Sequence, residues 1–119
     1  RVDMATTSMG RAFLWGVSGL ERDILFAAFE RRYGDGWPAI RAGIEQSFAE
    51  IDQRGFCIVD GEWQDDIRGV GVPLFSSDGS TALALNAAGP RFAADLQVLE
   101  QEAGPRLVHL SRSLAPMLG

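Results

Sequence analysis

The sequence predicts an α+β fold in which helices pack against an antiparallel sheet. Two observations lead to this prediction. Residues 6–54 show helical spacing of apolar residues, and three short strand-like segments then follow before a last helical segment reaches residue 114. Strands that follow one another closely pair as antiparallel neighbours, because a parallel pair needs a long crossover. Three strands make a thin core, so we expect the N-terminal helix and strands of the domain to lie upstream of Arg1.

Two helices are expected in the first third of the chain. The hydroxyls of Thr6-Thr7-Ser8 are good N-cap groups for a short helix that ends near Gly16. Ser18 and Glu21 have the spacing of a capping box, which begins a second helix that ends at Tyr33-Gly34. The expected apolar face of this second helix consists of Ile24, Leu25, Ala28 and Phe29.

A third helix is expected to begin at Pro38, because proline suits the first position of a helix. Spacings of four, four and three residues place its apolar side chains on one stripe. These side chains are Ile40, Ile44, Phe48 and Ile51. Gly55 fits the position just past the end of this helix, where a left-handed backbone favours glycine.

The strands and the last helix follow from shorter patterns. We expect strands at 56–59, 67–75 and 80–88, with a hairpin between the second and the third. A final helix is expected over residues 92–114, with a kink or break where Gly104-Pro105 interrupts it. Its apolar residues are Phe92, Leu96, Leu99, Leu107, Leu110 and Leu114.

The hairpin has two very different faces, because side chains alternate along a strand. One face carries ordinary core residues: Val70, Val72, Leu74, Leu83 and Leu85. The other face is almost without side chains: Gly69, Gly71, Pro73, Ala82, Ala84, Asn86 and Ala88. A loop of residues 76–79 would place Gly71 opposite Ala84. A two-residue turn at Asp78-Gly79 shifts the register by two residues but leaves the two faces unchanged.

The small-residue face has two explanations. Either a helix backbone or a neighbouring strand packs closely against it, or it borders a cavity in which Asn86 orients a small ligand. A buried amide without a partner costs about 1–3 kcal/mol, so Asn86 needs a neighbour or a ligand. The helix that follows Thr6-Thr7-Ser8 presents free N–H groups that would favour a carboxylate, unless the hydroxyls serve only to cap it.

Two arginines near this region are interpreted as surface residues. Arg11 falls in the first turns of the first helix, where a solvated role is favoured over a role in a site. Arg68 lies on the opposite face of its strand from Gly69, so we interpret it as a surface or interface residue before an anion ligand.

The composition argues against several classes of function. The net charge is −5 and all 11 basic residues are Arg, so non-specific nucleic-acid binding is not expected. One Cys and one His exclude a disulfide within the chain and disfavour a structural zinc site, and Cys57 is interpreted as a buried apolar residue. No apolar run is long enough for a membrane span, and no signal-peptide pattern begins the chain. We therefore expect a cytoplasmic protein without a metal, a cofactor or membrane contact.

Catalysis is not expected either. One cysteine cannot run a two-thiol redox cycle, and His109, on the last helix, has no motif partner for a catalytic triad. Asp65 and Asp66 are adjacent in an extended segment, so their carboxylates point apart and are expected to be exposed. We assign no catalytic residue and predict that the chain is not an enzyme.

Three motifs follow one another along the chain. Residues 4–14 read MATTSMGRAFL, residues 54–56 read RGF, and residues 68–90 contain RGVGVPLF, then DG, then LALNAAGP. These motifs resemble the A-T/S-x-x-G-K/R-A-x-L, RGY/F and R-x-I/V-A-A/V-P-V-F…DG…A-L-x-x-S/A-G-P segments of the IclR-type family of bacterial transcription regulators. The resemblance covers essentially the whole chain.

The resemblance implies a GAF-like effector-binding domain over residues 1–119, here without its first strands. In the family, a separate N-terminal winged helix–turn–helix domain binds DNA, so DNA contact is expected only through that domain. Family members form homodimers or homotetramers and bind small metabolites, often organic or aromatic acids. The positions that contact the ligand in the family are occupied here by Thr7, Ser8, Met9, Ile67, Gly69, Asn86 and Ala88.

The chain also departs from the family pattern. Family members often carry a small polar or thiol residue at the Gly69 position and Ser at the Asn86 and Ala88 positions, which implies a less polar ligand here, or a larger one that uses the space at Gly69. The acidic family residue after RGY/F is Val59, so a ligand contact from that position is in doubt. Trp63 is the best candidate for a pocket lid, because it lies in a loop.

Two functions stay open on the sequence. The chain is either the metabolite-sensing domain of a regulator or a dimerisation module with a closed cavity. In the second case, the third helix or the C-terminal helix would provide the interface.

Overall fold

The computed structural model describes residues 3–76, 79 and 82–118. The helices are α1 (Ser8–Gly16), α2 (Gly19–Tyr33), α3 (Trp37–Arg54), α4 (Leu96–Val98) and α5 (Gly104–Leu114). The strands are β1 (Cys57–Asp60), β2 (Ile67–Phe75) and β3 (Ala82–Pro90). A single turn, η1 (Gly34–Gly36), links α2 to α3, the π-helical turn η2 (Leu99–Ala103) links α4 to α5, and η3 (Ala115–Leu118) follows α5. The predicted α+β class is confirmed.

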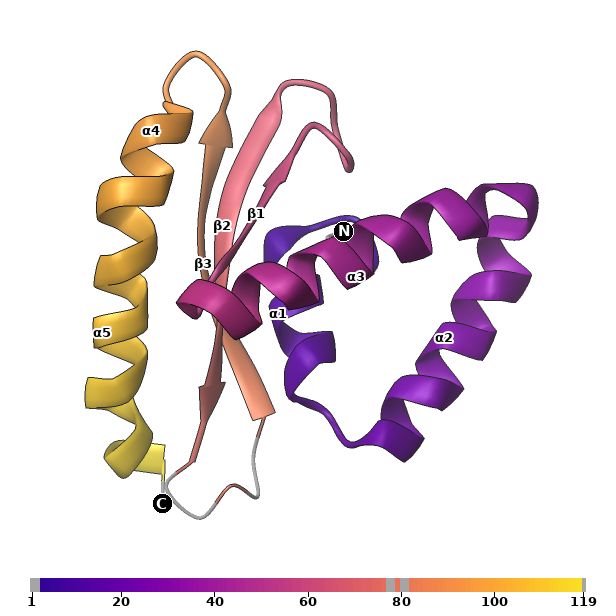
Figure 1. Ribbon diagram of the computed structural model, residues 1–119, viewed down its shortest axis with the longest axis horizontal. Coiled ribbons are helices and arrows are strands. Elements are labelled where there is room, and N and C mark those ends of the chain that lie inside the picture. The colour runs from indigo at the N-terminus through magenta and orange to yellow at the C-terminus, as the bar shows by residue number, and fades with distance from the viewer. Residues whose placement is uncertain (1–2, 77–78, 80–81, 119) are drawn as a thin grey trace.

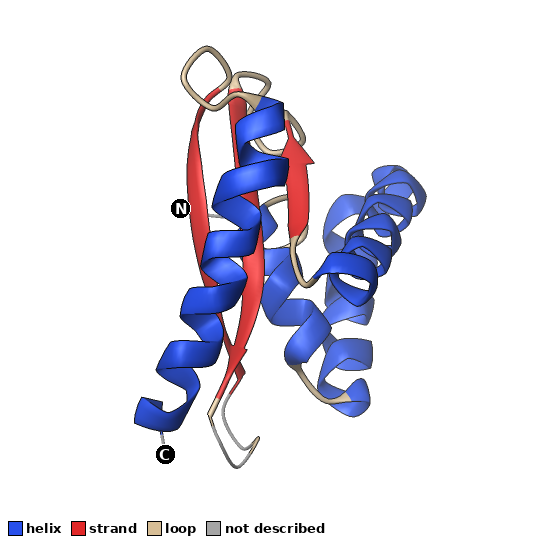
Figure 2. Cartoon of the chain, turned by 60° about the vertical axis from the view of Figure 1, so that its left-hand side comes forward, coloured by secondary structure: helices blue, strands red, loops and turns tan. Residues whose placement is uncertain are grey.

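The sheet lies between two layers of helix (Figures 1 and 2). Within the described residues it has three antiparallel strands in the order β1-β2-β3. Helix α1 packs on one face of β2 and β3, whereas α5 and η2 pack on the other face. Helices α2 and α3 extend away from the sheet on the α1 side (Figure 1).

The register of β2 and β3 is the one expected for a two-residue turn between them. Gly71 lies opposite Asn86 and Gly69 lies opposite Ala88. The pairing of Gly71 with Ala84, expected for a four-residue loop, is therefore wrong. The two faces of the hairpin are as predicted, because a shift of two residues conserves side-chain parity. Asp78 of the expected turn lies outside the described residues.

The close-packing explanation holds at Gly71. A Cβ atom on Gly71 would collide with the carbonyl oxygen of Ser8, at the start of α1. Gly69 differs, because its nearest neighbours are the Ser8 hydroxyl oxygen at 2.9 Å and the Ala88 Cβ at 3.0 Å from an ideal Cβ position. The backbone of α1 thus contacts the sheet at Gly71, whereas at Gly69 only the Ser8 side chain of α1 comes close to it.

Two larger clusters and one smaller one form the core. The α1–α2–α3 cluster is centred on Leu14, Phe29, Trp37 and Ile44. The cluster between the sheet and the C-terminal helix is centred on Phe56, Val70, Val72 and Leu99. A smaller cluster of Ala12, Ile51 and Cys57 lies where α1, α3 and β1 meet. The sheet is therefore packed on both faces.

The predicted helix signals are present at the N-termini of α1 and α2. The Thr7 hydroxyl accepts a hydrogen bond from the Gly10 amide at 3.1 Å, and the Ser18 hydroxyl accepts one from the Glu21 amide at 3.2 Å. Gly55 ends α3 with φ of 87°, which is the left-handed backbone expected there.

Two other expectations are wrong, and a third is met in part. Phe92 is 92% exposed and precedes the last helix, which begins at Leu96, where Asp95 accepts hydrogen bonds from Gln97 and Val98. Of the kink or break expected at Gly104-Pro105, the break does not occur, because the proline occupies the first turn of α5, but the helix is irregular there, since the π-helical turn η2 directly precedes Gly104. Ile24 is 63% exposed, so the apolar face of α2 is narrower than its spacing suggests.

Asp60 ties the end of β1 to two later segments. Its carboxylate accepts hydrogen bonds from Arg91 Nε at 2.6 Å and from Arg68 Nη2 at 3.0 Å. The hydrogen bond from Arg91, followed by that from Arg68, lowers the pKa of Asp60 from 3.8 to about 2. Arg68 also donates to the Ala94 carbonyl at 3.0 Å, so it fastens the chain after β3 to the sheet.

We expect Asp60→Asn to destabilise the domain in a pH-dependent way. Because the pKa of Asp60 is lowered on folding, its stabilising effect is complete above pH 3.8 and is lost as the pH falls toward about 2. The loss in unfolding free energy at neutral pH should be ~1 kcal/mol, since solvent screens this partly exposed carboxylate. Urea denaturation across that pH range measures it. A difference between variant and wild type that does not narrow with acid would contradict the assignment.

We expect Gly71→Ala to lower the unfolding free energy by about 3 kcal/mol, because the new methyl group would force the backbone of α1 off the sheet. Gly19→Ala is the matched control, since a Cβ at Gly19 meets no atom within 4 Å. The control should change stability by less than ~1 kcal/mol. Urea denaturation of both variants makes the comparison, and equal stabilities would show that α1 does not contact β2 at this point.

Candidate functional site

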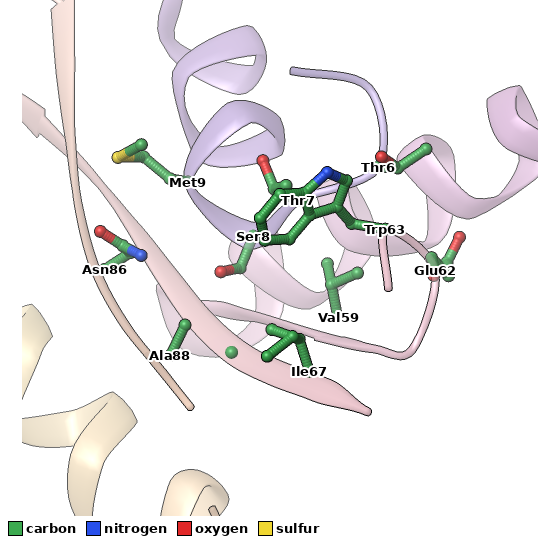
Figure 3. Close-up of a pocket in the computed structure, with 11 residues that line it drawn as sticks. Thr6, Thr7, Ser8, Met9, Val59, Glu62, Trp63, Ile67, Asn86 and Ala88 are labelled. Carbon is green, nitrogen blue, oxygen red and sulfur yellow. The ribbon is translucent and has the colours of Figure 1, made fainter. Parts of the chain in front are cut away.

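A pocket lies beside the part of the small-residue face that α1 leaves uncovered (Figure 3). Its walls come from the first turn of α1, the segment before it, the three strands, and the loop between β1 and β2. The cavity measures about 130 Å³. An apolar cavity of roughly 150 Å³ can hold benzene, so this pocket suits a ligand of about one small ring.

All of the residues expected to contact a ligand line this one pocket. They are Thr7, Ser8, Met9, Ile67, Gly69, Asn86 and Ala88. The other lining residues are Thr6, Val59, Glu62 and Trp63. Ligand contact by each of these residues stays a prediction, but their convergence from distant parts of the sequence is a property of the fold. Gly71 does not line the pocket, because α1 covers it.

The first turn of α1 supplies polar groups of two kinds. The Thr7 hydroxyl is used by the helix itself, since it donates to the Asp3 carbonyl at 2.5 Å and accepts from the Gly10 amide. Ser8 is only 4% exposed, and its hydroxyl has no hydrogen-bond partner in the part of the chain that the structure describes. The first N–H groups of a helix carry partial positive charge, so this wall favours a ligand that accepts hydrogen bonds.

The sheet wall is open because it lacks side chains. A methyl group on Gly69 would approach the Ser8 hydroxyl to 2.9 Å and narrow the cavity. The Asn86 side chain has no hydrogen-bond partner among residues 3–76, 79 and 82–118, and it also reaches solvent at the edge of β3. Figure 3 shows Asn86 and Ala88 on the same side of the pocket, facing Ser8. The free amide is therefore placed where it can orient a ligand.

Arg11 is not the solvated residue that the sequence suggested. It is 1% exposed, and its Nη2 and Nη1 donate to the two carboxylate oxygens of Glu62 at 2.7 and 3.0 Å. Its remaining donors reach the Ala5 carbonyl at 2.9 Å and the Ser47 hydroxyl at 3.2 Å. The expectation was wrong because α3 and the β1–β2 loop close over the first turns of α1.

The charge at the pocket wall is consequently balanced. Among the residues that line the pocket, Glu62 carries the only side-chain charge, and Arg11 compensates it from behind. The groups that face the cavity are then hydroxyls, an amide, apolar side chains and the N-terminus of α1. Trp63 lies beside Glu62 in the same loop and is 37% exposed, so its ring borders both the pocket and solvent.

Other candidate chemistry is not supported by the described part of the chain. No group of three or more His, Cys, Asp or Glu side chains within it is placed to hold a metal ion. None of its helices has the length and apolar character needed to cross a membrane. His109, Asp65 and Asp66 are exposed, as expected, and lie outside the pocket.

Comparison with solved structures places this arrangement in a family. A crystal structure of an IclR family transcriptional regulator from Brucella abortus has a TM-score of 0.90 and 30% sequence identity, and the match covers 99% of this chain and 44% of that one. The chain is an IclR-type effector-binding domain. The resemblance based on three motifs is thereby confirmed, although no protein-family sequence profile and no curated protein matches the chain.

Two structures of lower sequence identity share the fold. Thermotoga maritima IclR matches with a TM-score of 0.76 and 20% identity, over 99% of this chain and 48% of that one. The inducer-binding domain of PobR from Acinetobacter, a double mutant in complex with 3-hydroxybenzoic acid, matches with a TM-score of 0.74 and 18% identity, over 98% of this chain and 67% of that one. The chain spans about half the length of the Brucella and Thermotoga regulators.

Sequence reasoning missed Thr6 and Glu62 as pocket residues. Thr6 was considered only as a helix cap, and Glu62 was not considered because its partner Arg11 lies 51 residues away. The pairing of Arg11 with Glu62 has no local sequence signal. Val59 lines the pocket despite the missing carboxylate, so that position contributes an apolar wall.

We expect the Cys57 thiol to be unreactive in the folded domain. Burial, and secondarily the nearby Glu50 carboxylate, raises the pKa of Cys57 to about 12, and the thiol is fully buried beneath α1. Reaction with Ellman's reagent at about pH 8 should be at least ~100-fold slower than that of glutathione, and urea should restore the normal rate. Fast labelling of the folded domain would show that the α1–β1 contact opens readily.

Proposed function

We propose that the domain senses a small metabolite for a DNA-binding transcriptional regulator and helps that regulator to oligomerise. The observation that carries this proposal is the pocket at the start of α1, where the unpaired hydroxyl of Ser8, a helix N-terminus and a free amide surround an otherwise apolar cavity. Small-molecule sites are usually lined by apolar side chains and a few polar groups. Membership of the IclR family supports the regulatory role.

The ligand we propose is a small organic or aromatic acid. The N-terminus of α1 favours a carboxylate, and the charge of Glu62 is compensated by Arg11, so it does not repel an anion strongly. The size of the cavity and its apolar walls, Val59, Ile67 and Trp63, suit a single ring or a short aliphatic chain. A related inducer-binding domain, that of PobR, has been crystallised with 3-hydroxybenzoic acid.

Binding would act on DNA only indirectly. We propose that a separate N-terminal winged helix–turn–helix domain contacts DNA, that residues 1–119 belong to the effector domain, and that the regulator works in the cytoplasm as a homodimer or homotetramer. A ligand shifts such an assembly only if it binds one arrangement of the subunits more tightly than the other.

One observation favours a second candidate, a dimerisation module with a closed cavity. At Gly71 the space above the sheet is already filled by the backbone of α1. If the pocket beside Gly69 accepted no ligand, the domain would serve assembly alone. The two functions differ in a single measurable property, which is ligand binding.

We expect a thermal-shift screen of benzoate, hydroxybenzoates and short aliphatic carboxylates to find a stabilising compound. At about 100 times its Kd, a ligand stabilises the folded state by ~2.7 kcal/mol, which raises the Tm by several degrees. Asn86→Leu should weaken binding about tenfold, because the amide would be lost from the pocket wall. Calorimetry with the best compound measures that loss.

Gln53→Leu is the matched control, since it exchanges an exposed amide on α3, outside the pocket, for the same apolar side chain. It should leave the affinity unchanged. If no compound of the panel stabilises the domain, and Asn86→Leu leaves the response of the regulator unchanged, the sensing function is wrong and the closed module stands.

A further inference from the structure

The buried arginine of α1 has a function beyond its own helix. Arg11 forms a two-pronged ion pair with Glu62, and the side chains of the two residues are 1% and 42% exposed. Glu62 belongs to the loop between β1 and β2, and it is adjacent to Trp63. Both loop residues line the pocket, whereas Arg11 stands behind Glu62. The ion pair therefore joins the helical part of the domain to the β1–β2 loop, which forms one wall of the pocket.

The rest of this loop has few other attachments. Glu62, Trp63, Gln64, Asp65 and Asp66 are all exposed. Two backbone hydrogen bonds close the loop on itself, from the Gly61 amide to the Ile67 carbonyl at 2.8 Å and from the Ile67 amide to the Gln64 carbonyl at 3.0 Å. A third, from the Arg91 amide to the Asp66 carbonyl at 2.7 Å, attaches the C-terminal end of the loop to the chain after β3. The Trp63 side chain is 37% exposed, so part of the loop is buried, and the Arg11–Glu62 ion pair adds a strong polar contact that can decide the position of the exposed remainder.

The Arg11 side chain is held in position by contacts other than the ion pair. Arg11 is fixed by the Ala5 carbonyl and by the Ser47 hydroxyl of α3. At Gly43, also on α3, an added Cβ would lie 2.8 Å from Arg11 Nη2 and 2.9 Å from Glu62 Oε1. The absence of a side chain at Gly43 thus provides the space in which the two charged groups meet.

We propose that Arg11 is a positioning residue for the pocket. Through its ion pair, Arg11 holds Glu62 and the adjacent Trp63 in place as the wall that the β1–β2 loop contributes to the site. The ion pair with Glu62 is the clasp of this wall, and release of the clasp opens the pocket for ligand exchange. The inference rests on the proposed sensing function for its purpose, but the clasp itself is a property of the ligand-free domain.

The test uses the whole chain without ligand. In Glu62→Gln, which keeps the shape of the side chain and removes its charge, we expect the Gly61 and Ile67 amides to exchange with solvent about tenfold faster by NMR. The fluorine signal of Trp63 in 5-fluorotryptophan-labelled protein should shift, whereas those of Trp15 and Trp37 should not. The Trp63 signal is assigned by its loss in Trp63→Phe.

Glu45→Gln is the matched control, because it removes one carboxylate from the exposed Arg41–Glu45 pair of 3.2 Å on α3. It should leave the loop amides unchanged. Gly43→Ala tests the clasp with both charges retained, and it should open the loop because the methyl group crowds the pair; a helix interior tolerates alanine well. Gly43→Ala therefore separates loop opening from any general loss of stability that Glu62→Gln causes.

Faster exchange confined to the loop, in both Glu62→Gln and Gly43→Ala, supports the clasp. Unchanged loop amides overturn it, as does a uniform rise in exchange through α1, α3 and the sheet, because either result would leave the ion pair with a structural role alone. No ligand enters these measurements. A failed ligand screen with an opened loop rejects only the sensing function, and a stabilising ligand with an unmoved loop rejects only the clasp.

Discussion

The close approach of α1 to β2 at Gly71 is the constraint on which the site depends. The Ser8 carbonyl occupies the space that any side chain at Gly71 would need. This contact fixes the first turn of α1 directly on the sheet, whereas at Gly69 the nearest group of α1 is the Ser8 side chain and not the helix backbone. The pocket is therefore a gap at the end of a tight helix–sheet contact, which explains why it is small and why hydroxyls and a glycine form part of its wall, beside larger side chains such as Ile67 and Trp63.

The same contact determines the polarity of the site. Once α1 is seated, its N-terminus and the Ser8 hydroxyl point at the gap, and Arg11 is turned away toward α3. Glu62 pairs with Arg11, so the charge of the one charged lining residue is already compensated in the domain without ligand. Recognition then depends on dipoles and shape, which is a setting in which one misplaced polar group of the ligand is costly.

The pocket residues could be predicted from the sequence to the extent that they depend on local rules. Strand alternation placed Gly69, Asn86 and Ala88 on one face whatever the register, and the hydroxyls before α1 marked its start. Arg11 and Glu62 could not be found in this way, because their pairing depends on two segments that meet only in the folded chain. Composition also could not distinguish close packing from a cavity, since glycine serves both, and the structure uses Gly71 for one and Gly69 for the other.

The Arg11–Glu62 ion pair, in which only Arg11 is buried, is a poor source of stability, because the desolvation of Arg11 offsets much of its attraction. It is a good device for fixing one position of a loop, since only one geometry satisfies both carboxylate oxygens and the donors of the arginine. The sheet and α1 are held by apolar contacts and close backbone packing, which do not open singly. The β1–β2 loop, in contrast, is attached to α1 by the Arg11–Glu62 ion pair, which can break without disturbing the apolar core. Motion in this domain should therefore concentrate in that loop, and α3, which shares Arg11 through Ser47, is the element next in line to respond to it.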